Sequence, residues 1–162
     1  MVTAAGQLES ALKGWLNSPR VNMLITVSLK QALPTRWKDS IHWVRLTRDE
    51  TARAARIVRD RAAKKINRQG YRAGNWPFLV FIHEDSERLH LHILAERPPT
   101  MEPADFRSRF EHAVRSKVVW VYDHIHYSDI GDNPSARETV LGYGLKGGLC
   151  LENFVPEASF VG

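Results

Sequence analysis

Leu89-His90-Leu91-His92-Ile93-Leu94 is the stretch of this 162-residue chain that says most about its fold and its chemistry. In a β-strand, side chains two positions apart point to the same face, so His90 and His92 lie together while Leu89, Leu91 and Ile93 pack on the other side. Imidazole is the commonest metal-binding side chain, and this spacing therefore indicates a metal site on a rigid strand. Taken alone, the spacing also suits two hydrogen-bonded histidines on a half-exposed strand.

A tyrosine and a lysine further along the chain strengthen the first interpretation. Tyr143 and Lys146 are three positions apart, so they are neighbours on one surface if their segment is helical. Gly142 and Gly144 lower the helix propensity there, which leaves open a short or mobile helix, or the use of another tyrosine. The remaining tyrosines are interpreted as packing residues: Tyr71, Tyr122 and Tyr127.

Together these motifs resemble the HUH endonuclease superfamily, whose hallmark is a His-hydrophobic-His strand followed by a helix-borne Tyr-x-x-Lys. Their order, the single tyrosine and the length resemble the Rep class of single-strand nickases, and the apolar strand at 23–29 fits the first motif of that family. The resemblance implies a ferredoxin-like fold with the histidine strand at its centre. It also implies a metal-dependent reaction in which Tyr143 attacks DNA to form a 5′-phosphotyrosine and Lys146 steadies the phosphate.

A third metal ligand is expected from the strand that precedes the histidine pair. In related proteins this ligand is a glutamate, a glutamine or a histidine, and here that strand ends in His83-Glu84-Asp85. A shift of one residue in strand register exchanges His83 for Glu84 on the histidine face. We favour His83 as the third ligand, with Glu84 as the alternative. Imidazoles with or without a carboxylate accept several divalent metals, of which Mn²⁺ or Mg²⁺ is the expected cofactor.

A second pair of the same kind, His124-Ile125-His126, follows an apolar strand near residue 120. We do not favour it as the metal site, because no acid or imidazole lies on a sequence-adjacent hairpin strand and the family pattern places the pair before the second helix. The pair is interpreted as exposed or hydrogen-bonded histidines on an edge strand, with contact to phosphate or DNA as a weaker alternative.

Composition indicates one compact domain that binds polyanions. The apolar fraction of 43% is ordinary for a globular protein, and the formal net charge of +5 with a pI near 9.6 favours phosphate-containing partners. No apolar run is long enough to span a bilayer, and the first twenty residues lack the pattern of a secretory signal, so a cytoplasmic location without membrane partners is expected. The lone Cys150 cannot form an internal disulfide.

Basic residues concentrate in a segment with helical periodicity at positions 48–68. Its cations are interpreted as DNA contacts, although a solvated outer helix would have the same composition: Arg53, Arg56, Arg59, Lys64 and Lys65. Trp37, between Arg36 and Lys38 in an expected loop, is the tryptophan we favour for stacking on an unpaired base.

The order of expected elements defines an α+β fold with an antiparallel sheet and helices on one face. Strands are expected at 21–30, 41–46, 78–83, 89–94 and 118–127, with Pro34 in a turn, and helices at 48–68, 102–117 and 135–146. The last helix has Ser135 as its expected N-cap and Glu138 three residues later. Residues 1–20 are assigned to an N-terminal extension, 21–150 to the endonuclease domain and 151–162 to a C-terminal tail.

The sequence therefore predicts a metal-dependent enzyme that nicks and rejoins single-stranded DNA, in the replication or mobilisation of a plasmid, phage or transposable element. Two alternatives stay open: a non-catalytic DNA-binding protein of the same fold, and a phosphodiesterase without a covalent intermediate. The chain contains no P-loop motif, so unwinding is expected to come from a host or element-encoded helicase, or from a missing portion of a longer protein.

Overall fold

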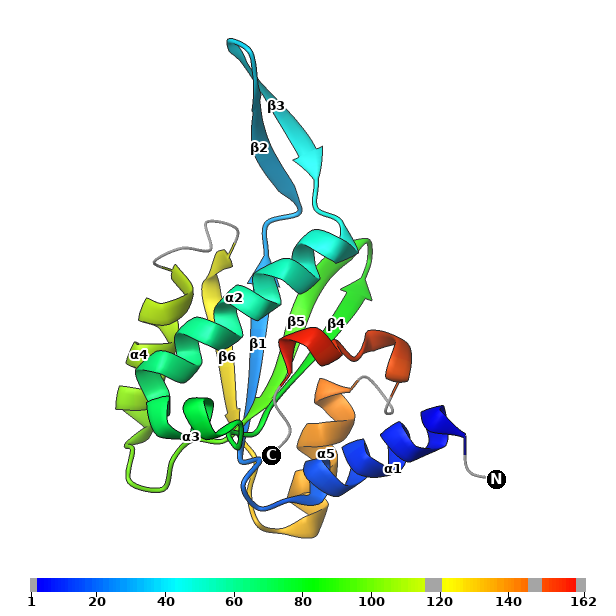
Figure 1. Ribbon diagram of the computed structural model, residues 1–162, viewed down its shortest axis with the longest axis vertical. Coiled ribbons are helices and arrows are strands. Elements are labelled where there is room, and N and C mark those ends of the chain that lie inside the picture. The colour runs from blue at the N-terminus through cyan, green and yellow to red at the C-terminus, as the bar shows by residue number, and fades with distance from the viewer. Residues whose placement is uncertain (1–2, 116–120, 146–149, 160–162) are drawn as a thin grey trace.

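The fold is built on a four-stranded antiparallel sheet whose strands are connected as in ferredoxin-like proteins (Figure 1). The computed structural model describes residues 3–115, 121–145 and 150–159. The sheet order is β4-β5-β1-β6. The connection from β1 to β4 contains a hairpin and two helices, and one helix joins β5 to β6. The strands are β1 (Met23–Leu29), β4 (Phe78–Asp85), β5 (Arg88–Ala95) and β6 (Val121–Asp129). The histidine strand β5 lies in the interior of the sheet, and the predicted α+β class is confirmed.

One face of the sheet carries the main hydrophobic core. Alternate residues of β1, from Met23 to Leu29, are buried on this face with those of β4 and β5, because a strand presents every second side chain to the same side. Two helices cover them: α2 (Arg48–Ile66) and α4 (Pro103–Arg115). Phe106 and Phe110 of α4 are fully buried against this face. Apolar periodicity in the sequence predicted both helices to within a few residues.

The start of α2 is fixed by a capping box. The Thr47 hydroxyl accepts a hydrogen bond from the Glu50 backbone amide, and the Glu50 carboxylate accepts one from the Thr47 amide. The hydrogen bonds that the Glu50 carboxylate accepts from the Thr47 amide and hydroxyl lower the pKa of Glu50. The helix ends at Ile66, and the short α3 (Arg68–Ala73) follows Asn67, so the single helix expected at 48–68 is divided near its end.

Helices also cover part of the second face, which the sequence did not predict. Leu12 and Leu16 of α1 (Ala4–Asn17) pack with Leu24, Leu94 and the end of α5 (Pro134–Gly144) in a second core. On this face the sheet is apolar at the end where Leu24 and Leu94 lie and polar at the other end. The two helices cover the apolar end, because burying polar side chains without partners is unfavourable.

The C-terminal segment covers the open edge of β4. The backbone amide of Val155 donates to the carbonyl of Val80 at 2.9 Å, and the Val80 amide donates to the Ser159 hydroxyl at 3.0 Å. Two short 3₁₀ helices lie in this segment, Leu151–Asn153 and Pro156–Ala158, and Phe154, Val155 and Ala158 are buried. The residues expected to form an N-terminal extension and a C-terminal tail thus supply side chains to the two cores.

A two-stranded hairpin projects from the body between β1 and α2 (Figure 1). It consists of β2 (Ala32–Trp37) and β3 (Ser40–Arg45), joined by a turn in which Lys38 has a φ of 52°. Pro34 lies within β2 and not in a turn as expected, because both strands of a two-stranded ribbon are edge strands, where proline is tolerated. The Leu46 amide donates to the Gln31 carbonyl at 2.7 Å and closes the base of the hairpin.

None of the described helices is both long enough and apolar enough to cross a membrane.

Candidate functional site

Three histidines form a cluster on the half-covered face of the sheet. His83 of β4 pairs directly with His90 of β5, and residues that pair directly in an antiparallel sheet point to the same side. His92 lies two positions further along β5 on that side. The ring centroids are 4.5 Å apart for His83 and His92, 4.8 Å for His90 and His92, and 5.9 Å for His83 and His90. His83 and His92 are buried, whereas His90 is half-buried.

The strand register distinguishes between the two expected third ligands. Glu84 pairs with Leu89 and therefore points to the opposite side of the sheet from the cluster. Its carboxylate is exposed and lies 3.7 Å from the guanidinium of Arg45. His83, and not Glu84, is thus the residue that lies beside the histidine pair.

The cluster consists of imidazoles, the donor type that divalent transition metals prefer, and its rings lie close together. Imidazole nitrogens bind transition metals at about 2.0–2.1 Å, and rings that share one ion have their centroids roughly 5 Å apart. The three centroid distances lie close to that value. In this structure the rings of His83 and His90 are stacked at 22°, and among the described residues no group of three His, Cys, Asp or Glu side chains has its donor atoms gathered around one point. The three imidazoles are thus neighbours whose rings pack against one another and do not surround a common point.

His90 and His92 line a pocket of about 1220 Å³. Thr26 and Ser28 of β1 form its floor with His90 and His92, and they pair directly with those histidines across the strands. Asp85, Ser86 and Arg88 line it from the β4–β5 turn, His124 from β6 and Gly142 from α5. The pocket therefore combines imidazoles, three hydroxyls and a guanidinium, which are groups that bind phosphate oxygens, with the carboxylate of Asp85.

The expected nucleophile belongs to the helix that bounds this pocket. Tyr143 is the residue after Gly142, in the last turn of α5, while the position of its side chain and all of Lys146 fall outside the described part of the structure. The helix starts at Pro134 and not at 135, because the Asn133 side chain accepts from the Ser135 amide at 2.9 Å and proline suits the first helical position. Asn133 therefore caps α5, in place of the expected Ser135.

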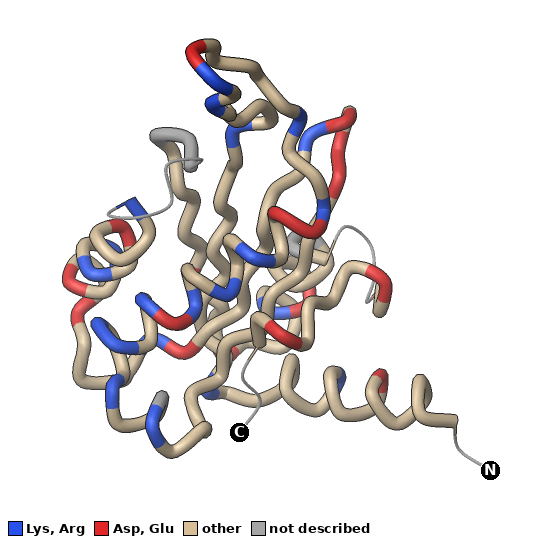
Figure 2. Tube along the Cα trace, turned by 45° about the horizontal axis from the view of Figure 1, so that its top comes forward, with Lys and Arg blue, Asp and Glu red and all other residues tan. Residues whose placement is uncertain are grey.

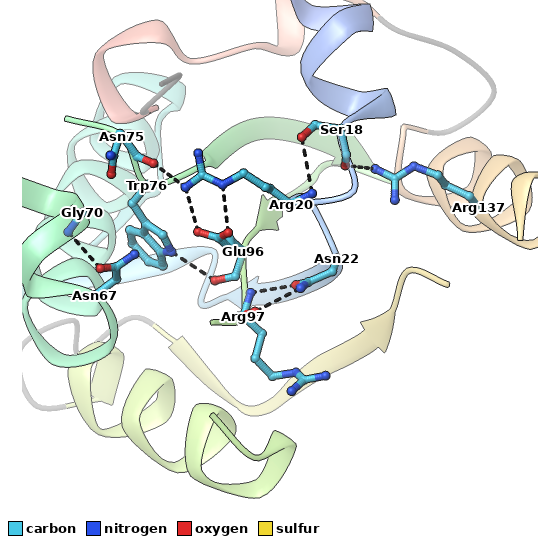
Figure 3. A network of polar contacts seen from close by, with 10 residues as sticks. All are labelled: Ser18, Arg20, Asn22, Asn67, Gly70, Asn75, Trp76, Glu96, Arg97 and Arg137. Atoms are coloured by element: carbon cyan, nitrogen blue, oxygen red, sulfur yellow. Dashed lines mark hydrogen bonds and ion pairs between the residues drawn. The ribbon is translucent and has the colours of Figure 1, made fainter. Parts of the chain in front are cut away.

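An arginine fixes α5 against the end of α1 (Figure 3). The guanidinium of Arg137 donates to the carbonyl of Leu16 and, at 2.6 Å, to the carbonyl of Ser18. These carbonyls lie at the C-terminal end of α1, where a helix leaves acceptors unsatisfied and attracts cations. Burial lowers the pKa of Arg137. In the same loop Arg20 makes a bidentate pair with the Glu96 carboxylate at 2.9 and 3.0 Å.

The second histidine pair lies on the same face as the first. Thr26 of β1 pairs with His92 on one side and with His126 on the other, so both pairs flank one threonine. His124 and His126 are exposed on the edge strand β6, as expected, and His124 lines the pocket. Sequence reasoning did not predict that the two histidine pairs are close, because β6 pairs with β1, a strand far away in the sequence. The same reasoning overlooked Thr26 and Ser28, although they are the polar residues of an apolar strand at alternate positions.

The basic residues of α2 lie away from the histidine face, because α2 packs on the opposite side of the sheet (Figure 2). Arg53, Arg56, Lys64 and Lys65 are exposed there. Arg59 instead donates to Asp60 at 2.8 Å and to the carbonyl of Glu157 at 2.7 Å, and so fixes the C-terminal segment on α2. DNA contact by these residues stays a prediction, and the structure does not bring them to the pocket.

Two further aromatic residues bear on the predicted site. Trp37, at the end of β2, is 68% exposed on the projecting hairpin. Tyr127 of β6 packs on the opposite face from the histidines, with its ring against Phe110 and beneath Arg107. Burial raises the pKa of the Tyr127 phenol above its ordinary value, which agrees with its interpretation as a packing residue.

Comparisons with models of protein families, with curated proteins and with solved structures found no match for this chain.

Proposed function

We propose that this protein is a metal-dependent, single-tyrosine endonuclease of the HUH type, which nicks and rejoins single-stranded DNA. One observation carries the proposal: the His83, His90 and His92 imidazoles lie together, and His90 and His92 line a pocket that is also lined by Gly142, the residue before Tyr143 in α5. The order of the motifs in the sequence supports the same assignment. We further propose a cytoplasmic role in replicating or mobilising a plasmid, phage or transposable element, with a separate helicase supplying single-stranded substrate.

The metal site is assigned to the three histidines. A divalent ion held there, Mn²⁺ or Mg²⁺, would offset negative charge on the scissile phosphate. Thr26 and Ser28 supply hydroxyls on the pocket floor, and the exposed Arg88 supplies positive charge at its rim. These groups orient the phosphodiester by hydrogen bonds and ion pairing.

The proposed chemistry is a transfer of the phosphoryl group between two oxygens. The phenol oxygen of Tyr143 forms a bond to phosphorus while the bond from phosphorus to the 3′ oxygen breaks, and the phenol proton is balanced by the proton that the released 3′-hydroxyl gains. Lys146, three residues further on, is assigned to steady the phosphate. The product is a 5′-phosphotyrosine, and attack of a 3′-hydroxyl on it reverses the steps and rejoins the strand.

The test of this proposal is a covalent adduct. The protein is incubated with a mixed single-stranded DNA pool and Mn²⁺, and a denaturation-resistant complex is sought by electrophoresis. We expect an adduct with the unmodified protein and with His112→Ala, an exposed histidine of α4 that serves as the control. We expect none with Tyr143→Phe, which keeps the ring and removes the attacking oxygen. Mapping an adduct to Tyr71, Tyr122 or Tyr127 would overturn the assignment of the nucleophile.

Two other outcomes correspond to the alternatives. Strand cleavage without an adduct would identify a phosphodiesterase without a covalent intermediate, and DNA binding with neither cleavage nor adduct would identify a binding protein.

The metal site is tested separately by the rise in melting temperature that Mn²⁺ produces. That rise should disappear when His90 and His92 are replaced by alanine and persist when His124 and His126 are replaced. The reverse pattern would place the metal on β6.

A further inference from the structure

The two faces of the β2–β3 hairpin differ in what they present. Side chains alternate along each strand and paired residues share a side, so Trp43 lies on one face with Pro34 and Arg36. Trp37 lies on the other face with Val44. Both tryptophans are exposed to the same extent, 70% for Trp43 and 68% for Trp37. The hairpin therefore offers two comparable aromatic residues in opposite directions.

The Trp43 face of the hairpin adjoins the histidine site. Trp43 and Arg45 line a depression of about 500 Å³ together with residues of the β4–β5 turn. Three residues, Gln31, Ser86 and Arg88, line both this depression and the histidine pocket. A continuous groove therefore runs from the Trp43 indole past Arg88 to His90.

The base of the hairpin is fixed to the strand that carries the histidines. The Gln31 side chain donates to the carbonyl of Leu89 at 2.9 Å and accepts from the Leu89 amide at 2.7 Å, in the manner of a paired strand. Arg45 reaches the β4–β5 turn, 3.7 Å from the Glu84 carboxylate and 3.9 Å from that of Glu87. The hairpin that carries Trp43 is thus attached to β5 at Leu89, the residue before His90.

The chemistry of this groove is that of a site for single-stranded nucleic acid. Exposed aromatic rings stack on bases of any sequence, and nearby cations contact the backbone. Within the described part of the chain, neither Arg36 nor Arg88 lies within ion-pair distance of a carboxylate, and both are exposed. Ile41, 67% exposed, pairs with Arg36 on the same face and extends the apolar surface.

From these observations we infer that Trp43 stacks on an unpaired base of a DNA strand and that Arg88 contacts a phosphate of the same DNA strand. The groove then directs this DNA strand to the histidines. The inference rests on the proposed function for the identity of the ligand as DNA. It assigns to the hairpin the positioning of the strand next to the nucleotide that is cut. The sequence favoured Trp37 for stacking, whereas the groove lies on the side of Trp43.

The test compares the two tryptophans in a binding assay without divalent metal, so that cleavage plays no part. Affinity for fluorescein-labelled oligothymidylate is measured by anisotropy with the full chain. Trp43→Ala should weaken binding roughly 5- to 150-fold, the loss of one stacked base, while Trp37→Ala should leave affinity within about twofold. Arg88→Gln should lower the slope of log affinity against log salt by about one, as the loss of one phosphate contact requires. Melting temperatures of the variants confirm folding.

The remaining outcomes separate this inference from the proposed function. Equal losses for Trp43→Ala and Trp37→Ala, or no loss for either, would overturn the assignment of the groove even if the DNA adduct forms. Selective loss for Trp43→Ala would support it even if no adduct ever forms. Duplex DNA that binds as tightly as oligothymidylate, with the same dependence on Trp43, would overturn base stacking. A change from dimer to monomer on Trp43→Ala, measured by light scattering, would instead identify the face as a contact between copies.

Discussion

Replacing Arg137 with alanine removes the arginine that fixes α5 to the end of α1. The side chain makes three hydrogen bonds to two carbonyls, and hydrogen bonds from a charged group contribute about 1.5–3 kcal/mol each. The bonds share one part-buried guanidinium, and water can reach the carbonyls once it is gone. We therefore expect a net loss of about 2–4 kcal/mol in the free energy of unfolding, below the sum of the three.

The assay is urea denaturation followed by circular dichroism, with thermal melting as a second measure. A loss of that size lowers the melting temperature of a chain of this length by roughly 6–12 °C. Arg56→Ala, an exposed cation of α2, serves as the control and should change stability by less than about 0.5 kcal/mol. Arg137→Lys should fall between the two, because lysine keeps the charge without the planar fork.

The same variant reports on the position of Tyr143. If Arg137 sets the orientation of α5, the adduct should form more slowly with Arg137→Ala even at temperatures where the variant is fully folded. A loss of stability below about 0.5 kcal/mol would refute the reasoning, since it would mean that solvent replaces the guanidinium at no cost.

Two smaller predictions concern the sheet. Glu87→Gly should stabilise the protein by about 0.5–1 kcal/mol in urea denaturation, because Glu87 has a φ of 63° in the β4–β5 turn, where glycine has no steric penalty. Destabilisation would mean that the contact between Glu87 and Arg45 contributes more than exposed ion pairs usually do. Tyr127→Phe should raise the free energy of unfolding by about 0.5–1.5 kcal/mol and leave adduct formation unchanged, because the buried Tyr127 hydroxyl has no hydrogen-bond partner in the described structure. A melting temperature below that of the unmodified protein would contradict this prediction.

Local patterns were sufficient to predict the elements on which the site stands. Alternation along 89–94 predicted a strand with both histidines on one face, and the position of His83 at the end of the preceding strand made it the favoured third ligand. The choice between His83 and Glu84 depends on a single step of register. That step is set by the two-residue turn at Ser86 and Glu87, both with positive φ, which the polar sequence of this loop did not indicate.

Contacts between distant segments could not be predicted in the same way. The pairing of β1 with β6 places His126 beside Thr26, a separation of a hundred residues that no local period records. In the sequence Arg59 is one cation among several on a basic helix, yet it donates a hydrogen bond to the carbonyl of Glu157, 98 positions further along the chain. The packing of α1 depends on a match between its leucines and the apolar end of the sheet, which exists only once the sheet has formed.

The hydrogen bond between Leu46 and Gln31 has a consequence for how this protein can change. Because the chain leaves and rejoins the body at neighbouring points, residues 32–45 form an appendage outside the four-stranded sheet, which contacts the body near its base through residues such as Arg45. A hairpin of different length or sequence can be exchanged there without altering the histidine strand. If the proposed function holds and the hairpin selects the substrate, recognition and strand breakage would be separable parts, and a protein with the same pocket and another hairpin would recognise different DNA.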